Sequence, residues 1–148
     1  MILDLHPEIS IRKLTIGAEQ APLLVIDNFV ADADRLVRRA ASRRFAQLPG
    51  YYPGLRVEAP LSYQQLIIDR LGAVLFDYFE LIGKSLRFTM CHYSLVTTPA
   101  EQLSLLQRIP HFDSLGRNAL ASIHYLFKSD LGGTAFYRHR KTGFEYID

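Results

Sequence analysis

The stretch LRFTMCHYSLV at residues 86–96 decides the fold that this sequence predicts, because aromatic and β-branched residues become frequent from here onward. Such residues favour strands. Further segments of this kind predict three more strands, at residues 105–113, 119–127 and 133–140. After them Lys141-Thr142-Gly143 predicts a hairpin turn, with a return strand beginning at Phe144. Successive strands with short connections predict an antiparallel sheet that rolls toward a barrel or a sandwich.

The first half of the chain predicts one strand followed by two helices. The apolar run PLLVIDNF at residues 22–29 is typical of a short buried strand. A second helix is expected to start near Ser62, since Ser62 and Gln65 have capping-box spacing, and to end at Gly83. Helices first and strands second indicate the α+β class. The first helix follows the strand, and its N-cap candidates are Asp32 and Asp34.

The first helix carries an arginine-rich face. At about 100° per residue its arginines share an arc of roughly 140°, opposite an apolar stripe. Such a face is most often simply solvated, and contact with phosphates is the alternative. No aromatic residues accompany it for base stacking, so we expect no nucleic-acid partner. The arginines of this face are Arg35, Arg38, Arg39 and Arg43.

Size and composition are those of one globular domain over residues 1–148, with a formal net charge of +2. No apolar run approaches the ~18 residues that span a bilayer, and the first residues are too acidic for a signal peptide. The single cysteine, Cys91, suits a reducing compartment and a buried strand position. We therefore expect a cytoplasmic protein with no membrane partner. We also expect its domain to be incomplete at the C-terminus, because the return strand has barely begun at Asp148.

His111 and Asp113 are the strongest candidates for a functional site. Alternate residues of a strand point to one face, which would place their Cα atoms about 6.6 Å apart on the same side. One metal ion can bridge that distance, and a histidine with an aspartate makes two thirds of a 2-His-1-carboxylate site for non-haem Fe(II). The alternative is a structural hydrogen-bonded pair or an exposed edge.

The surrounding motifs resemble a known family. The order Tyr93, Pro110-His111-Phe112-Asp113, Arg117-Asn118, Tyr125-Leu126 and Gly132-Gly133-Thr134-Ala135-Phe136 resembles the prolyl-4-hydroxylase-like branch of the 2-oxoglutarate and Fe(II)-dependent dioxygenases. The match spans roughly residues 24–136 and is similar to a bacterial branch with no assigned activity. This resemblance implies N-terminal helices packed on a double-stranded β-helix, also called a jelly roll. It also implies that His111 and Asp113 bind Fe(II), that 2-oxoglutarate is the co-substrate, and that a small molecule, amino acid or peptide is hydroxylated.

The sequence departs from that family at two points. In the family a second histidine and a basic residue that holds 2-oxoglutarate lie well beyond the Gly-Gly turn, and this sequence ends before both. Arg108 also stands where an aromatic residue is common. His139 could replace the missing ligand by its position, although an exposed hairpin residue is the alternative. We therefore expect weak metal binding by these residues alone. The remaining histidines are expected in packed, surface or terminal positions: His6, His92 and His124.

Two further readings of the sequence stay open. The chain could be a non-catalytic β-sandwich module or a degenerate homologue, pairing with a partner or a second copy through an open sheet edge. The basic cluster at residues 138–141 could bind an anionic group, or it could be a solvated turn.

Overall fold

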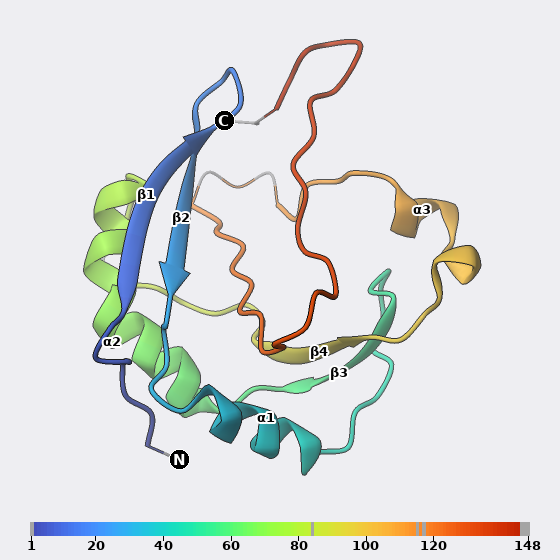
Figure 1. Cartoon of the computed structure of the whole chain (residues 1–148). Coiled ribbons are helices and arrows are strands. Elements are labelled where there is room, and N and C mark those ends of the chain that lie inside the picture. The colour runs from blue at the N-terminus through green and yellow to red at the C-terminus, as the bar shows by residue number, and fades with distance from the viewer. Residues whose placement is uncertain (1, 84, 115, 117, 146–148) are drawn as a thin grey trace.

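The computed structural model describes residues 2–83, 85–114, 116 and 118–145. Helices and strands are mixed, as the sequence predicts, and the strands form two antiparallel pairs (Figure 1). The elements in chain order are β1 (Ser10–Ile16), β2 (Ala21–Asp27), α1 (Ala33–Ala41), β3 (Gly54–Glu58), α2 (Leu61–Tyr78), β4 (His92–Val96), a 3₁₀ turn (Ala100–Gln102) and α3 (Leu105–Arg108).

The first pair is a hairpin of β1 and β2, in register from Ser10 opposite Asp27 to Ile16 opposite Ala21. Its turn needs left-handed backbone at Gly17, with φ of 71°, and at Gln20, with φ of 55°. The apolar run predicted as a strand is confirmed by β2. β1 was not predicted, because nearly all of its side chains are exposed and its sequence lacks an apolar run.

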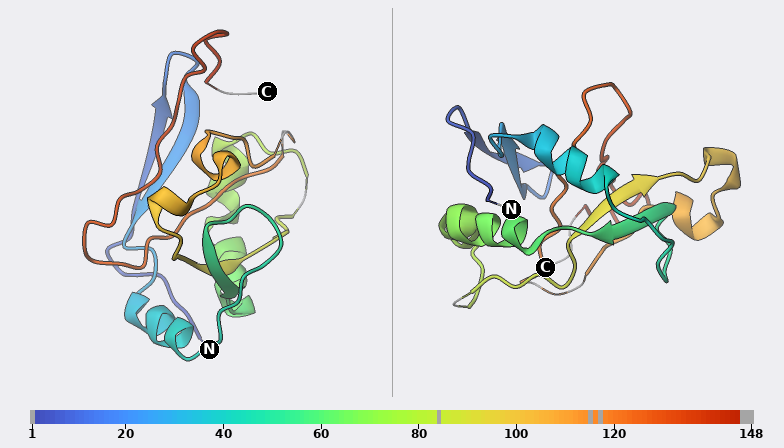
Figure 2. Two further views of the ribbon diagram at one scale, coloured as in Figure 1. Left: turned by 90° about the vertical axis from the view of Figure 1, so that its right-hand side faces the viewer. Right: turned by 90° about the horizontal axis from the view of Figure 1, so that it is seen from below.

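The second pair joins β3 and β4 and runs from Gly54 opposite Val96 to Glu58 opposite His92. A Cβ atom at Gly54 would lie 1.9 Å from the Leu95 carbonyl oxygen, so this close crossing requires glycine. The strand predicted at residues 86–96 is confirmed only for its last five residues. Figure 2 shows both pairs from two further directions.

Helix α1 begins as predicted, since the Asp32 carboxylate accepts a hydrogen bond of 2.8 Å from the Arg35 backbone N–H. The predicted capping box of α2 is wrong: Pro60 precedes the helix, and Gln65 donates instead to Asp69 at 2.7 Å. α2 also ends at Tyr78 rather than at Gly83. Both helices contribute to the core, which consists of Phe29, Val30, Leu36, Leu66, Ile67, Leu71 and Tyr93.

The second half of the chain differs most from the prediction. The strand expected at residues 105–113 begins instead as α3, where the Ser104 N–H donates to Gln107 Oε1 at 2.8 Å. Residues 119–127 and 133–140 were expected as strands, but no strand follows β4 in the part of the chain that the structure describes. In Figure 1 this part, orange to red, runs as an irregular chain between the β1–β2 hairpin and α3.

The predicted hairpin turn is nevertheless present. The His139 N–H donates to the Phe144 carbonyl and the Gly143 N–H to the His139 carbonyl, both at 2.8 Å. Gly143 has a φ of 77°, which favours glycine. Residues 146–148 of the predicted return strand lie outside the described residues.

Among the helices of the described residues, none has the length and apolar character needed to cross a membrane.

Candidate functional site

His111 and Asp113 lie close together on the irregular segment that follows α3. His111 Nε2 is 3.6 Å from Asp113 Oδ1, and the two side chains are 67% and 73% exposed. The predicted strand that was to align them is absent, so a local bend of the chain brings them together instead. The two side chains therefore lie close together, on a segment that does not form the strand expected at residues 105–113.

The second nitrogen of the His111 ring makes a contact that favours one tautomer of the neutral ring. Nδ1 lies 3.2 Å from the Ile109 carbonyl oxygen. Because a carbonyl oxygen can only accept, Nδ1 must carry the proton in this contact. In the neutral ring Nε2 then has a free lone pair, and this atom lies 3.6 Å from Asp113 Oδ1. Metal-binding histidines commonly have this arrangement, with the other ring N–H donating to a carbonyl.

The spacing of the two candidate ligand atoms is compatible with one metal ion. Ligands about 2.1 Å from an ion and at right angles to each other are about 3.0 Å apart. The observed 3.6 Å closes to that value by small rotations of two exposed side chains. Arg108 does not compete for the carboxylate, because its guanidinium donates to the Glu101 carbonyl at 3.1 Å.

Within the described part of the chain, no third protein ligand is grouped with this pair. Over residues 2–83, 85–114, 116 and 118–145, no three His, Cys, Asp or Glu side chains are grouped to hold a metal. His139 lies in the exposed hairpin, where its Nδ1 is 2.7 Å from Thr142 Oγ1. Two further motifs of the resemblance include Asn118 and Gly132. The Asn118 side chain accepts a hydrogen bond of 2.9 Å from the Ile82 N–H, and Gly132 has a φ of 85°. Arg117 lies outside the described residues.

A second group of titratable side chains is half-buried and was not predicted as a unit. His124 stacks on Tyr63 of α2, with 5.8 Å between ring centroids, and meets the edge of Phe29. Its Nδ1 lies 2.9 Å from the Tyr63 hydroxyl. Burial lowers the pKa of His124, and burial is also the main reason that the pKa of Tyr63 is raised. His124 was expected to be a packed or surface residue, and it is packed.

The basic cluster at residues 138–141 is partly neutralised, since Arg138 forms an ion pair of 2.5 Å with Glu145. Glu145 also accepts from the Glu19 N–H in the β1–β2 turn at 3.1 Å. Both contacts lower the pKa of the Glu145 carboxyl, the Glu19 contact more than the Arg138 contact. This carboxylate therefore ties the C-terminal hairpin to the N-terminal one.

Comparison with known proteins gives a family and no activity. No curated protein and no solved structure matches the chain. Residues 7–148 match the family of unknown function DUF6445, and the chain belongs to that family.

Proposed function

We propose that this chain carries two of the three protein ligands of a non-haem Fe(II) site and acts as a 2-oxoglutarate-dependent oxygenase of the hydroxylase type. The observation that carries the proposal is the local geometry of His111. Its Nδ1 lies 3.2 Å from the Ile109 carbonyl oxygen, a contact that in the neutral ring leaves the lone pair on Nε2, 3.6 Å from Asp113 Oδ1. Together with the motifs around it, this pair supports the site that the resemblance implies.

In this function the residues of the chain bind and orient the metal. His111 would bind through Nε2 and Asp113 through Oδ1, and the Ile109 carbonyl would hold the imidazole in the correct tautomer. The ion would supply redox chemistry at coordination positions left open for oxygen and 2-oxoglutarate. The third ligand and the group that holds 2-oxoglutarate would come from outside the described residues or from a second copy. A cytoplasmic location, with its reducing conditions, suits both Fe(II) and a free thiol such as Cys91.

The double-stranded β-helix remains part of this proposal. Its support is the alternation along residues 123–127: His124 and Leu126 are partly buried, whereas Ile123, Tyr125 and Phe127 are 61%, 46% and 42% exposed. Such alternation is typical of a strand that lies on a core. In the complete β-helix, neighbouring strands would form backbone hydrogen bonds with both edges of this segment.

A non-catalytic binding module is the second candidate, because the second half of the chain exposes many large apolar side chains. An exposed apolar surface of this kind marks an interaction site. In this function the module would pair with a partner or with a second copy through this surface and its unpaired edges. The most exposed of these residues after α3 are Phe112, Ile123, Leu131, Phe136, Tyr137 and Phe144.

Anaerobic titration with Fe(II), with and without 2-oxoglutarate, tests the oxygenase proposal. Calorimetry should show weak binding that 2-oxoglutarate strengthens and that His111→Ala abolishes. His139→Ala is the matched control, since His139 is exposed in a hairpin and should leave binding unchanged. Binding that is equal in the wild type and in His111→Ala would refute the site. Dimerisation by light scattering, without Fe(II) binding, would favour the binding module.

A further inference from the structure

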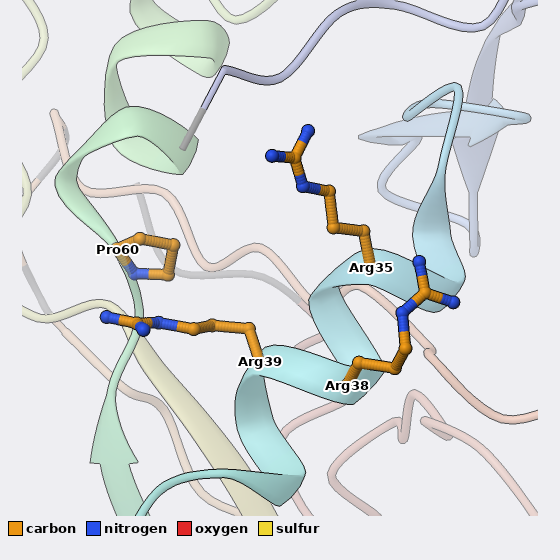
Figure 3. A pocket seen from close by; sticks show the side chains of 4 residues that line it. All are labelled: Arg35, Arg38, Arg39 and Pro60. Carbon is orange, nitrogen blue, oxygen red and sulfur yellow. The ribbon is translucent and has the colours of Figure 1, made fainter.

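Three arginines of α1 line an open depression of about 410 Å³ on the protein surface. Arg35, Arg38 and Arg39 line it from the helix, and Pro60, just before α2, lines its other side (Figure 3). None of the described residues that line it is acidic. Figure 3 shows Arg35 and Arg39 leaving α1 on the same side, with the extended Arg39 side chain reaching Pro60. The depression is therefore walled mainly by positive charge.

The partners of these arginines leave most of that charge uncompensated. Arg38 forms an ion pair of 3.2 Å with Asp32, but the two side chains are 67% and 52% exposed, so solvent screens the pair. Arg35 donates to the Ile2 carbonyl, which is neutral, at 3.1 Å. Among the described residues no carboxylate pairs with Arg39. Within the described residues, Arg38 alone of these three arginines forms an ion pair, and its partner is exposed.

This arrangement works against the stability of the helix. Arginines three and four residues apart repel each other, and Arg35 also lies in the first turn, where the helix dipole disfavours a cation. Leu36, which is 1% exposed, fixes the rotation of α1, so the arginine face cannot turn away from the depression. An anion in the depression would remove this repulsion.

Tyr93 carries a buried polar group on which the charge of Arg39 acts. Its side chain is 8% exposed, and its hydroxyl has no hydrogen-bond partner among the described residues. Burial raises the pKa of this hydroxyl, and the nearby positive charge of Arg39 opposes that rise. Arg39 therefore lines the depression and is also close enough to this buried hydroxyl for its charge to act on it.

We propose that this depression, the α1 arginine site, binds the phosphate group of a small phosphorylated compound. The planar guanidinium matches phosphate oxygens with paired, charge-assisted hydrogen bonds. A depression of this volume suits a phosphomonoester or a diphosphate. The site does not depend on His111 or Asp113: α1 and α3, the helix before that pair, lie apart in both figures of the whole chain.

Calorimetric titration with inorganic pyrophosphate tests this site. The ionic strength is kept at about 0.1 M, where the Debye length is about 10 Å. The wild type should show saturable binding that Arg39→Gln and Arg35→Gln each weaken about tenfold. Arg43→Gln removes the same charge just beyond the C-cap of α1 and outside the depression, and should change the affinity less than twofold. Circular dichroism checks that each variant is folded. The absence of saturable binding, or an equal loss with Arg43→Gln, would overturn the proposal.

A phosphate group can belong to a soluble compound or to a lipid headgroup, and a second experiment separates these sources. The protein is sedimented with vesicles of phosphatidylcholine containing phosphatidic acid. Pyrophosphate binding without co-sedimentation supports a soluble phosphorylated ligand. Co-sedimentation that Arg39→Gln abolishes and Arg43→Gln preserves supports a headgroup in the same site. Co-sedimentation that survives Arg39→Gln, without pyrophosphate binding, would overturn the site.

Discussion

The Tyr63 hydroxyl and His124 Nδ1 lie 2.9 Å apart, although 61 positions separate them in the sequence. Their rings are stacked at an interplanar angle of 17°, and Phe29 packs against both at its edge. This contact connects α2 to the segment that runs toward the C-terminal hairpin. It is therefore one of the interactions that hold the irregular second half of the chain against the core.

Tyr63→Phe should weaken that connection while keeping the stacked ring. The substitution leaves His124 Nδ1 partly buried without its partner, so we expect the free energy of unfolding to fall by about 1 kcal/mol. Urea denaturation followed by circular dichroism measures this loss. Tyr51→Phe is the control, because Tyr51 is 67% exposed and should change stability by less than about 0.5 kcal/mol. Equal effects of the two substitutions would refute the structural role of the pair.

His124 should make the stability of the protein depend on pH. Burial lowers its pKa in the folded chain below the usual 6.5, so the unfolded chain binds more protons between the two values. The free energy of unfolding should therefore be fully retained above about pH 6.5 and fall as the pH drops toward the lower, folded-state pKa. His124→Phe keeps a ring and cannot titrate, so that variant should lose this component of the pH dependence. Denaturation curves from pH 5 to 8, about the range in which histidine titrates, provide the comparison.

Gly54→Ala should disrupt the β3–β4 pair. The added Cβ would lie 1.9 Å from the Leu95 carbonyl oxygen, which is backbone and cannot turn aside. We expect a loss of about 2 kcal/mol or more in the free energy of unfolding. Gly133→Ala is matched in chemistry, but its Cβ would lie an ordinary 3.7 Å from the Tyr125 hydroxyl. Thermal unfolding should therefore show a large decrease in Tm for the first variant only.

The parts of the fold that the sequence predicts are those that local signals determine. β2 has its own apolar run, and α1 has Asp32 as a cap on its first turn, so neither depends on distant partners. β1 could not be found in this way, because SIRKLTI is mostly exposed and forms a strand only by pairing with β2. At residues 105–108 a local contact between Ser104 and Gln107 overrides the strand preference of the segment.

The same distinction applies to the candidate sites. His111 and Asp113 are two residues apart in the sequence. Their side chains can therefore lie close together whether the segment is a strand or a bend. The packing of Tyr63 on His124 could not be predicted from the local sequence around either residue. Only the folded chain brings α2 to the segment that contains His124. The arginine face of α1 was predictable from helical periodicity, whereas the position of Pro60 opposite it was not.

The tautomers of two histidines provide the most direct test of the proposed metal site. At a pH above about 8, where imidazoles are neutral, His111 should carry its proton on Nδ1, because that nitrogen faces the Ile109 carbonyl. His139 should carry its proton on Nε2, because its Nδ1 accepts from the Thr142 N–H at 3.3 Å. Long-range proton–nitrogen correlation spectra of ¹⁵N-labelled protein distinguish the two forms, and His111→Ala and His139→Ala assign the signals.

The two histidines then differ in what a metal should do to them. Zn²⁺, a redox-inactive substitute, should shift the Nε2 signal of His111 and leave the ring signals of His139 in place. Asp113→Asn should reduce the shift at His111, because it removes the charge of the second ligand while preserving the size of the side chain. A proton on Nε2 of His111 in the metal-free protein would remove the observation on which the proposed function rests, since the lone pair would then face the Ile109 carbonyl instead of the metal.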